Sequence, residues 1–129
     1  FMAEMTIKKR PKNLDLTTIR LPLPGKVSIL HRVSGAGLFL CLPILLWLFG
    51  ASLTSPETFA TLTALASSLP VKVVLAGLIW AYCHHFCAGI RFLLLDLHIG
   101  IEKEAANKSA AAVLAVSIPL TLVLWGILL

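Results

Sequence analysis

The segment 81–98, AYCHHFCAGIRFLLLDLH, places two adjacent histidines inside a run of apolar residues. Its ionisable side chains include His84, His85, Arg91 and Asp96. A histidine within the hydrocarbon of a membrane is costly unless it bonds to a partner, so such a residue usually marks a functional site. The segment therefore predicts that at least one of the two histidines has a bound partner.

The composition of the chain indicates a membrane protein. Apolar residues make up 58% of its 129 residues and charged residues only 13%, far below the share in soluble domains. Three apolar runs are long enough to cross about 30 Å of hydrocarbon at about 1.5 Å per helical residue. They predict transmembrane helices at about 28–53, 71–97 and 109–129. The expected fold is thus all-α, with a basic N-terminal segment at 1–27 and a three-helix membrane anchor at 28–129.

Small residues indicate how these helices could pack. Gly35 and Gly37 in the first span would let a neighbouring helix approach closely. Ala111 and Ala115 in the third span form a small-xxx-small pair that predicts a packing face. Such faces suggest that the three helices are part of a larger helix bundle.

The positive charges are unevenly distributed along the chain. Seven lysines and arginines precede or include Arg32, and three lie at the end of the second span and in the following connector. The remaining one, Lys72, is at the start of the second span. Because cytoplasmic segments are enriched in these residues, we expect a cytoplasmic N-terminus and second connector, and a C-terminus on the outer side of the membrane. The basic segment leads directly into a membrane span, which argues against nucleic-acid binding.

A second polar cluster lies at the cytoplasmic start of the first span. Ser28, His31 and Arg32 are three and four residues apart, so a helix presents them on one face. In the second span, His85 lies six residues before Arg91, or about 9 Å deeper along the helix axis. Both clusters are therefore predicted on the same side of the membrane.

The residues of these two clusters could together bind a haem within the membrane. A membrane haem needs a neutral imidazole ligand in the bilayer and cationic donors for its propionates nearer the water. His85 would be the ligand, His31 and Arg32 the donors, and Gly89 would leave space for the flat macrocycle one turn later. The neighbouring His84 points about 100° away. A second axial ligand is therefore expected from another chain.

Other interpretations of these residues stay open. Interfacial arginines and histidines commonly extend to lipid head groups, and His84 alone could bond to a backbone carbonyl. Cys83 and Cys87 are four residues apart, but structural zinc sites add loop-borne ligands, so buried thiols are the simpler interpretation. A proton-relaying transporter or channel subunit would contain no haem. A purely structural assembly subunit would leave the cluster of Ser28, His31 and Arg32 without a role.

Two motifs resemble the cytochrome b556 subunit family of succinate dehydrogenase, respiratory complex II, in its proteobacterial form. The first comprises Arg10-Pro11 and Asn13-Leu14-Asp15-Leu16, followed by Ser28-Ile29-Leu30-His31-Arg32-Val33-Ser34-Gly35. The second is His85-x-x-x-Gly89-Ile90-Arg91-Phe92, closing on Asp96. With the three spans, the similarity covers nearly the whole chain. Three residues depart from the family pattern: Lys12, Leu95 and His98.

The resemblance implies a haem b that is shared with a second anchor subunit within a heteromeric helix bundle. His85 would be the axial ligand of the haem iron, with His31 and Arg32 at the propionates. Ser28, Ile29 and Arg32 would border the ubiquinone pocket. A hydroxyl and a guanidinium suit this task, since both can donate hydrogen bonds to a quinone oxygen as negative charge develops on it.

Asp96 is a further candidate, for proton delivery to the quinone. The alternative is that Asp96 is a carboxylate at a helix end and pairs with Arg91 or Lys103.

The resemblance also implies partners and a location. The chain would pass electrons from succinate to ubiquinone in a bacterial inner membrane, as a subunit that is not catalytic alone. FAD and iron–sulfur clusters would belong only to a flavoprotein subunit and an iron–sulfur subunit, because this chain has no residues to hold them. Membrane lipid and ubiquinone are further expected partners. The alternative function is the anchor subunit of a quinol:fumarate reductase, which uses the same parts in reverse.

Overall fold

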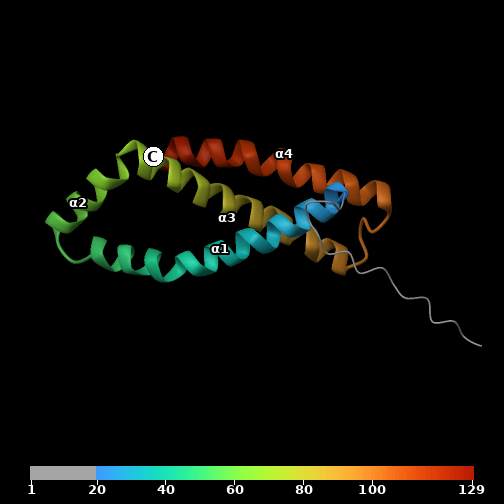
Figure 1. Cartoon of the computed structure of the whole chain (residues 1–129), viewed down its shortest axis with the longest axis horizontal. Helices are drawn as coiled ribbons and strands as arrows, with labels where there is room; N and C mark the ends of the chain where they lie inside the picture. Colours follow the sequence, from blue (N-terminus) through green and yellow to red (C-terminus); the bar gives the residue numbers. More distant parts are fainter. Residues whose placement is uncertain (1–19) are drawn as a thin grey trace, which may run out of the picture.

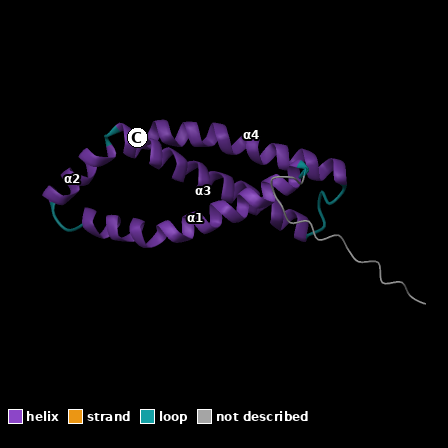
Figure 2. Ribbon diagram, viewed as in Figure 1, coloured by secondary structure: helices purple, strands orange, loops and turns teal. Residues whose placement is uncertain are grey.

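The computed structural model describes residues 20–129, which form four α-helices and no strand (Figures 1 and 2). The helices are α1 (Leu23–Ser52), α2 (Pro56–Ala66), α3 (Leu69–Asp96) and α4 (Lys103–Leu128). Helices α1, α3 and α4 are each long and apolar enough to cross a membrane. The predicted all-α class with three membrane helices is confirmed. The motif residues Arg10 to Leu16 and most of the segment 1–27 lie outside the described residues.

Two prolines mark the beginning of α1, and a third proline lies inside the helix without ending it. The helix begins at Leu23, five residues before the predicted span, with Pro22 at its N-cap and Pro24 in its first turn. Proline is well tolerated there, because the first N–H groups of a helix have no intrahelical acceptor. Further along, α1 continues through Pro43 and α4 through Pro119. Membrane helices tolerate such interior prolines because neighbouring groups satisfy the freed carbonyls.

Helix α2 lies inside the segment 54–70, for which the sequence predicted only a connector. Ser55 caps the helix, with its Oγ accepting a bond from the Thr58 N–H at 3.1 Å. Pro56 occupies the first helical position, and the negative charge of Glu57 lies near the positive end of the helix dipole. As Figure 1 shows, α2 connects the far end of α1 to the start of α3.

Helix α3 is the central element of the bundle, since it packs against both α1 and α4. The buried core is small and consists of Val27, Ala88, Ala110 and Val113. At the far end of the bundle, the Trp125 Nε1–H donates to the Lys72 carbonyl at 3.2 Å and joins α4 to the start of α3. The three membrane helices are therefore held by contacts spread along α3.

The small-residue pair predicted on α4 does not pack against the other helices of this chain. Ala111 and Ala115 are exposed, whereas Ala110, Val113 and Ser117 face α3 and α1. The cause is that α4 is apolar on all sides, so its sequence has no polar stripe that identifies the outer face. The face that packs within this chain lies about 100° around the helix from the small-residue pair, which remains exposed. Packing of that pair against a helix of another chain stays a prediction.

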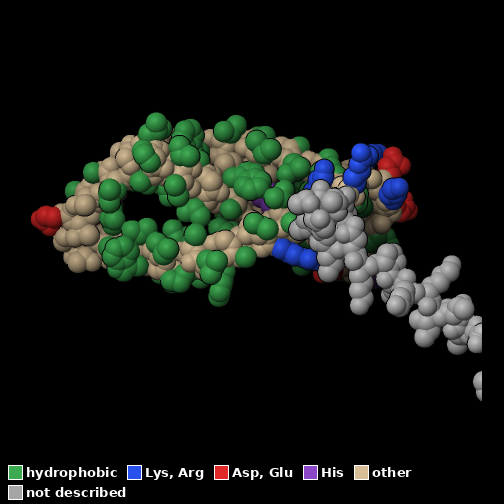
Figure 3. Space-filling view, viewed as in Figure 1, with side chains coloured by type: hydrophobic (Ala, Val, Ile, Leu, Met, Phe, Trp, Pro, Cys, Tyr) green, Lys and Arg blue, Asp and Glu red, His purple; other side chains and the backbone are tan. Residues whose placement is uncertain are grey.

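Large apolar side chains cover the outside of the molecule (Figure 3). On the face shown, lysines and arginines gather at the end that holds the connection between α3 and α4. The same view shows an opening through the molecule between α1 and α3. It lies on the side of their crossing point that is away from the lysines and arginines. An apolar exterior with charges at its ends suits helices surrounded by lipid or by other membrane helices.

Candidate functional site

Helices α1 and α3 meet closely where Gly35 faces His85. A Cβ atom added to Gly35 would lie 2.7 Å from Cε1 of His85. Carbon atoms in contact are normally about 3.5–4.0 Å apart, so only glycine fits here without displacement. Gly37, the other glycine predicted to favour packing, faces open space. Gly35 thus allows the imidazole of His85 to lie against the α1 backbone.

The bonds made by His85 fix the orientation of its ring. Its Nδ1 lies 3.1 Å from the His31 carbonyl oxygen and 3.2 Å from the Ser34 Oγ. The Ser34 hydroxyl donates its own bond to the same carbonyl at 3.0 Å. A carbonyl can only accept, so the network assigns the proton of neutral His85 to Nδ1. The lone pair is then on Nε2, which is the arrangement in which a metal-binding histidine presents its ligand atom.

The His31 side chain lies against the ring of His85. Its ring stacks on His85 with centroids 4.1 Å apart and planes 6° apart, and it lies 4.9 Å from the Phe92 ring. Its Nε2 lies 3.8 Å from where a Cβ on Gly89 would stand. Helix packing thus brings three of the predicted residues together, namely His31, His85 and Gly89.

The adjacent His84 has a different environment. It is fully buried and stacks on Trp80, with ring centroids 5.0 Å apart. Neither of its ring nitrogens makes a hydrogen bond of regular geometry within residues 20–129, although the Val27 backbone lies close to the ring. His85, by contrast, is only half-buried. The two histidines therefore differ in their roles, with His84 packed inside the chain and His85 able to reach a group outside it.

The other predicted site residues are more open. Arg32 is exposed near the start of α1, where Ser28 and Ile29 are half-buried. Asp96 is exposed at the end of α3. In the described part of the chain, the only ion pair joins Lys108 to Glu104 at 3.2 Å. The proposed pairing of Asp96 with Arg91 or Lys103 is therefore not present there.

Ser34 is a site residue to which the sequence analysis gave no role. The serine was part of the first motif, but nothing in the spacing indicated a bond to His85. Its contact depends on where α1 crosses α3, which the sequence alone does not specify. The available signal was local: Ser34 directly precedes Gly35 and is one turn after His31.

Arg91 joins α3 to the beginning of α4. Its side chain is only 6% exposed, and its Nε–H donates to the Ser109 Oγ at 2.8 Å. One Nη2–H also points to the Ala106 carbonyl at 3.3 Å. These bonds hold the two helices together at the end where they are connected.

We expect Ser109→Ala to loosen this junction. The substitution leaves a buried guanidinium N–H without its acceptor, which costs about 1 kcal/mol of stability. Thermal unfolding of the purified protein should show a lower Tm. The control is Ser52→Ala, because Ser52 bonds only to the Phe49 carbonyl at an exposed helix end. An unchanged Tm for Ser109→Ala would contradict the stabilising role of the bond.

The cysteines do not form a multi-ligand metal site in the described part of the chain. Cys41, Cys83 and Cys87 are free thiols, and residues 20–129 contain no group of three or more metal-binding side chains. A metal held by this region would therefore take few ligands from it. His85 is suited to supply one.

The sequence comparisons identify the family. Residues 6–124 match the succinate dehydrogenase/fumarate reductase transmembrane subunit family. The chain belongs to this family. It is 35% identical to the succinate dehydrogenase cytochrome b556 subunit of Paracoccus denitrificans over 92% of each chain. It is 37% identical to that of Coxiella burnetii, over 92% of this chain and 95% of the relative.

The cytochrome b556 subunit of Rickettsia prowazekii is similar as well, with 34% identity over 91% of each chain. The resemblance inferred from the two motifs is thus confirmed for nearly the full length. The chain is a transmembrane subunit of the succinate dehydrogenase and fumarate reductase family, and its three apolar helices agree with that assignment.

Proposed function

We propose that this subunit anchors a succinate dehydrogenase, binds haem b together with a second anchor subunit, and helps to form the ubiquinone-reduction site. The observation that carries the haem assignment is the bond from His85 Nδ1 to the His31 carbonyl. This bond leaves Nε2 as a free ligand atom within an apolar helix. Haem b, when bound there, would take up and release single electrons.

The residues around His85 would position and orient the ligand. Gly35 lets the ring lie against α1, and the His31 carbonyl and Ser34 hydroxyl hold Nδ1. Because His85 is half-buried, its outer side remains available to a group shared with another chain. A further ligand for the iron would come from the second anchor subunit, since His84 is enclosed within this chain.

His31 and Arg32 would bind the two propionates. Arg32 is exposed and forms no ion pair with the residues described, so its guanidinium can take a carboxylate as a bidentate partner. The same residue, with Ser28 and Ile29, would border the quinone. Ser28 and Arg32 would donate hydrogen bonds to the quinone oxygen as it becomes negative. Asp96 would deliver protons from the exposed end of α3.

The proposal also includes an orientation and partners. The N-terminus and the connection between α3 and α4 would be in the cytoplasm, because most of the lysines and arginines are in these segments. The C-terminus would be in the periplasm. A flavoprotein subunit and an iron–sulfur subunit would then dock on the cytoplasmic side. They would supply FAD and the iron–sulfur clusters, and the complex would lie in the bacterial inner membrane.

A quinol:fumarate reductase anchor is the second candidate. The family includes transmembrane subunits of both enzymes. The names of the relatives, which are succinate dehydrogenase subunits, favour the first candidate. The ratio of succinate oxidation to fumarate reduction by the purified complex would separate the two.

We expect Arg32→Leu to slow the rate of quinone reduction by about 100-fold. Removing one hydrogen-bond donor to a developing negative charge typically costs this much. Succinate oxidation with an artificial soluble acceptor should remain, because that reaction does not use the membrane site. Both rates are measured on the purified complex, with Lys108→Leu as a control at the same end. Normal quinone reduction would reject the role of Arg32. Loss of both activities would indicate failed assembly.

A further inference from the structure

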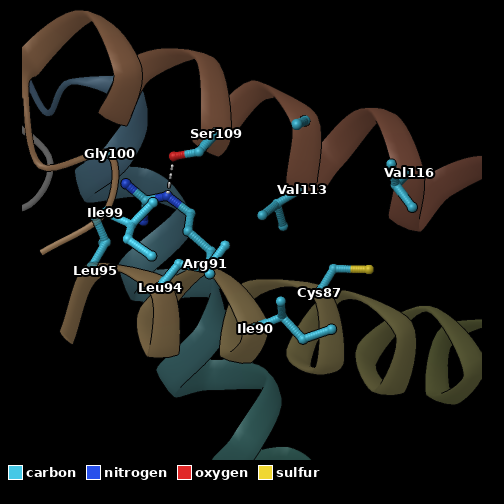
Figure 4. A pocket seen from close by; sticks show the side chains of 11 residues that line it. Cys87, Ile90, Arg91, Leu94, Leu95, Ile99, Gly100, Ser109, Val113 and Val116 are labelled. Carbon is cyan, nitrogen blue, oxygen red and sulfur yellow. Dashed lines mark hydrogen bonds between the residues drawn. The ribbon is translucent and has the colours of Figure 1, made fainter. Parts of the chain in front are cut away.

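A groove of about 360 Å³ lies between α3 and α4 (Figure 4). Its walls are almost wholly apolar and include Cys87 and Ile90 from α3 and Val113 and Val116 from α4. Arg91 lies at the end that is closed by the connection between the two helices. No residue of α1 lines the groove. Its volume falls within the range of about 300–1,000 Å³ that is typical of sites for small molecules.

The cation at this end of the groove lacks a negative partner. Arg91 is 6% exposed, and its two hydrogen bonds go to the neutral Ser109 hydroxyl and the Ala106 carbonyl. No carboxylate within residues 20–129 pairs with it. A guanidinium has five N–H donors, so donors remain for another group. A buried cation without a counter-charge is costly, which favours an anion as the missing partner.

The groove lies on the opposite side of α3 from His85. At about 100° per residue, Ile90, Leu94 and Cys87 lie about 140°, 180° and 200° around the helix from His85. The second anchor subunit would contact the His85 side, a step that rests on the proposed function. The groove would then remain directed toward lipid.

The depth of the groove suits a lipid as well. Arg91 is five residues before the end of α3, or about 8 Å along the helix, which places its guanidinium near the head-group region. We propose that an anionic phospholipid occupies the groove, with its phosphate on Arg91 and an acyl chain along the apolar walls. Arginine binds phosphate through paired hydrogen bonds, and basic pockets between cytoplasmic helix ends bind anionic head groups.

The test is native mass spectrometry of the purified full complex with added phosphatidylglycerol. Arg91→Gln removes the charge, and Ala112→Phe fills the groove while keeping the charge, because Ala112 lines the groove and is exposed. Arg91→Gln should bind this lipid about tenfold more weakly, the loss expected for one charge-assisted contact. Ala112→Phe should bind it at least as weakly, because the ring takes the space of the acyl chain. Lys108→Gln removes another cation at the same end and should bind it normally.

Three results would overturn the proposal. One is equal binding of phosphatidylglycerol by all variants, and another is loss in Arg91→Gln with full binding in Ala112→Phe. The third is equally tight binding of zwitterionic phosphatidylcholine by the unaltered complex. The visible spectrum of the same samples reports haem separately. If the complex binds the lipid but shows no haem spectrum, the proposed function is contradicted and the lipid site is still supported.

Discussion

Replacing His85 by leucine should remove haem b from the purified complex, whereas replacing His84 by leucine should leave it bound. In the first variant the iron loses the imidazole whose Nδ1 bonds to the His31 carbonyl and whose Nε2 is thereby left free to coordinate. In the second, leucine replaces a buried ring whose nitrogens make no hydrogen bond of regular geometry in residues 20–129. An apolar residue of similar size is close to neutral at such a position. The measurement is the reduced-minus-oxidised visible spectrum.

The pair of variants is its own control, because the two residues are adjacent on one helix and equal in size. Equal, normal haem spectra in both would reject His85 as the ligand. Loss of haem in the His84 variant alone would exchange the roles of the two histidines. Assembly is checked by co-purification of the partner subunits and by succinate oxidation with a soluble acceptor.

Gly35→Ala should reduce haem content by about tenfold, because the added methyl group meets His85 at 2.7 Å. The methyl group cannot move, since it is fixed to the α1 backbone. The imidazole must therefore shift away and lose the alignment of Nδ1 with the His31 carbonyl. Disturbing such a supporting contact typically costs about 10–100-fold in metal affinity. Haem per complex, measured by the pyridine haemochrome spectrum, tests this expectation.

Gly37→Ala is the matched control, because a methyl group on Gly37 meets no atom within 4 Å. Both glycines are on α1, and both substitutions raise the intrinsic preference for helix by a similar amount. A lower haem content only in the Gly35 variant would identify the contact with His85 as the cause. A Gly35→Ala complex with normal haem content and an unchanged spectrum would contradict the role of Gly35.

A proton relay through the two histidines, which is an alternative interpretation of the sequence, has little support in the arrangement of His84. A relay needs a chain of hydrogen-bonded groups. His84 has no such bond within the described residues, and it packs on the Trp80 ring. Its contacts are those of a side chain that fills the interior between helices.

The sequence predicted the architecture well because membrane helices have strong local signals. Three uncharged runs of sufficient length predict three helices, irrespective of how they pack. Helix α2 was missed because it is short, although Ser55, Pro56 and Glu57 form a recognisable helix start. Which face of α4 packs within this chain was also not predicted, although Ser117 and Thr121 are four residues apart on its buried side.

The site was predictable in its residues but not in its contacts. Spacing along single helices related His31 to Arg32 and His85 to Gly89. The bond from His85 to the His31 carbonyl and the need for Gly35 depend on the crossing point of α1 and α3. That crossing is set by packing between residues 51 and 54 positions apart in sequence, and no local pattern specifies it. The role of Ser34 depends on the same crossing.

The most direct test of the central claim is the visible absorption spectrum of the purified, reduced complex that contains this chain and its partner anchor. We predict the sharp α-band of a six-coordinate b-type haem, present in the unaltered complex and in His84→Leu and absent in His85→Leu. A complex that oxidises succinate and reduces ubiquinone without a haem band would contradict the assignment of His85 as a haem ligand.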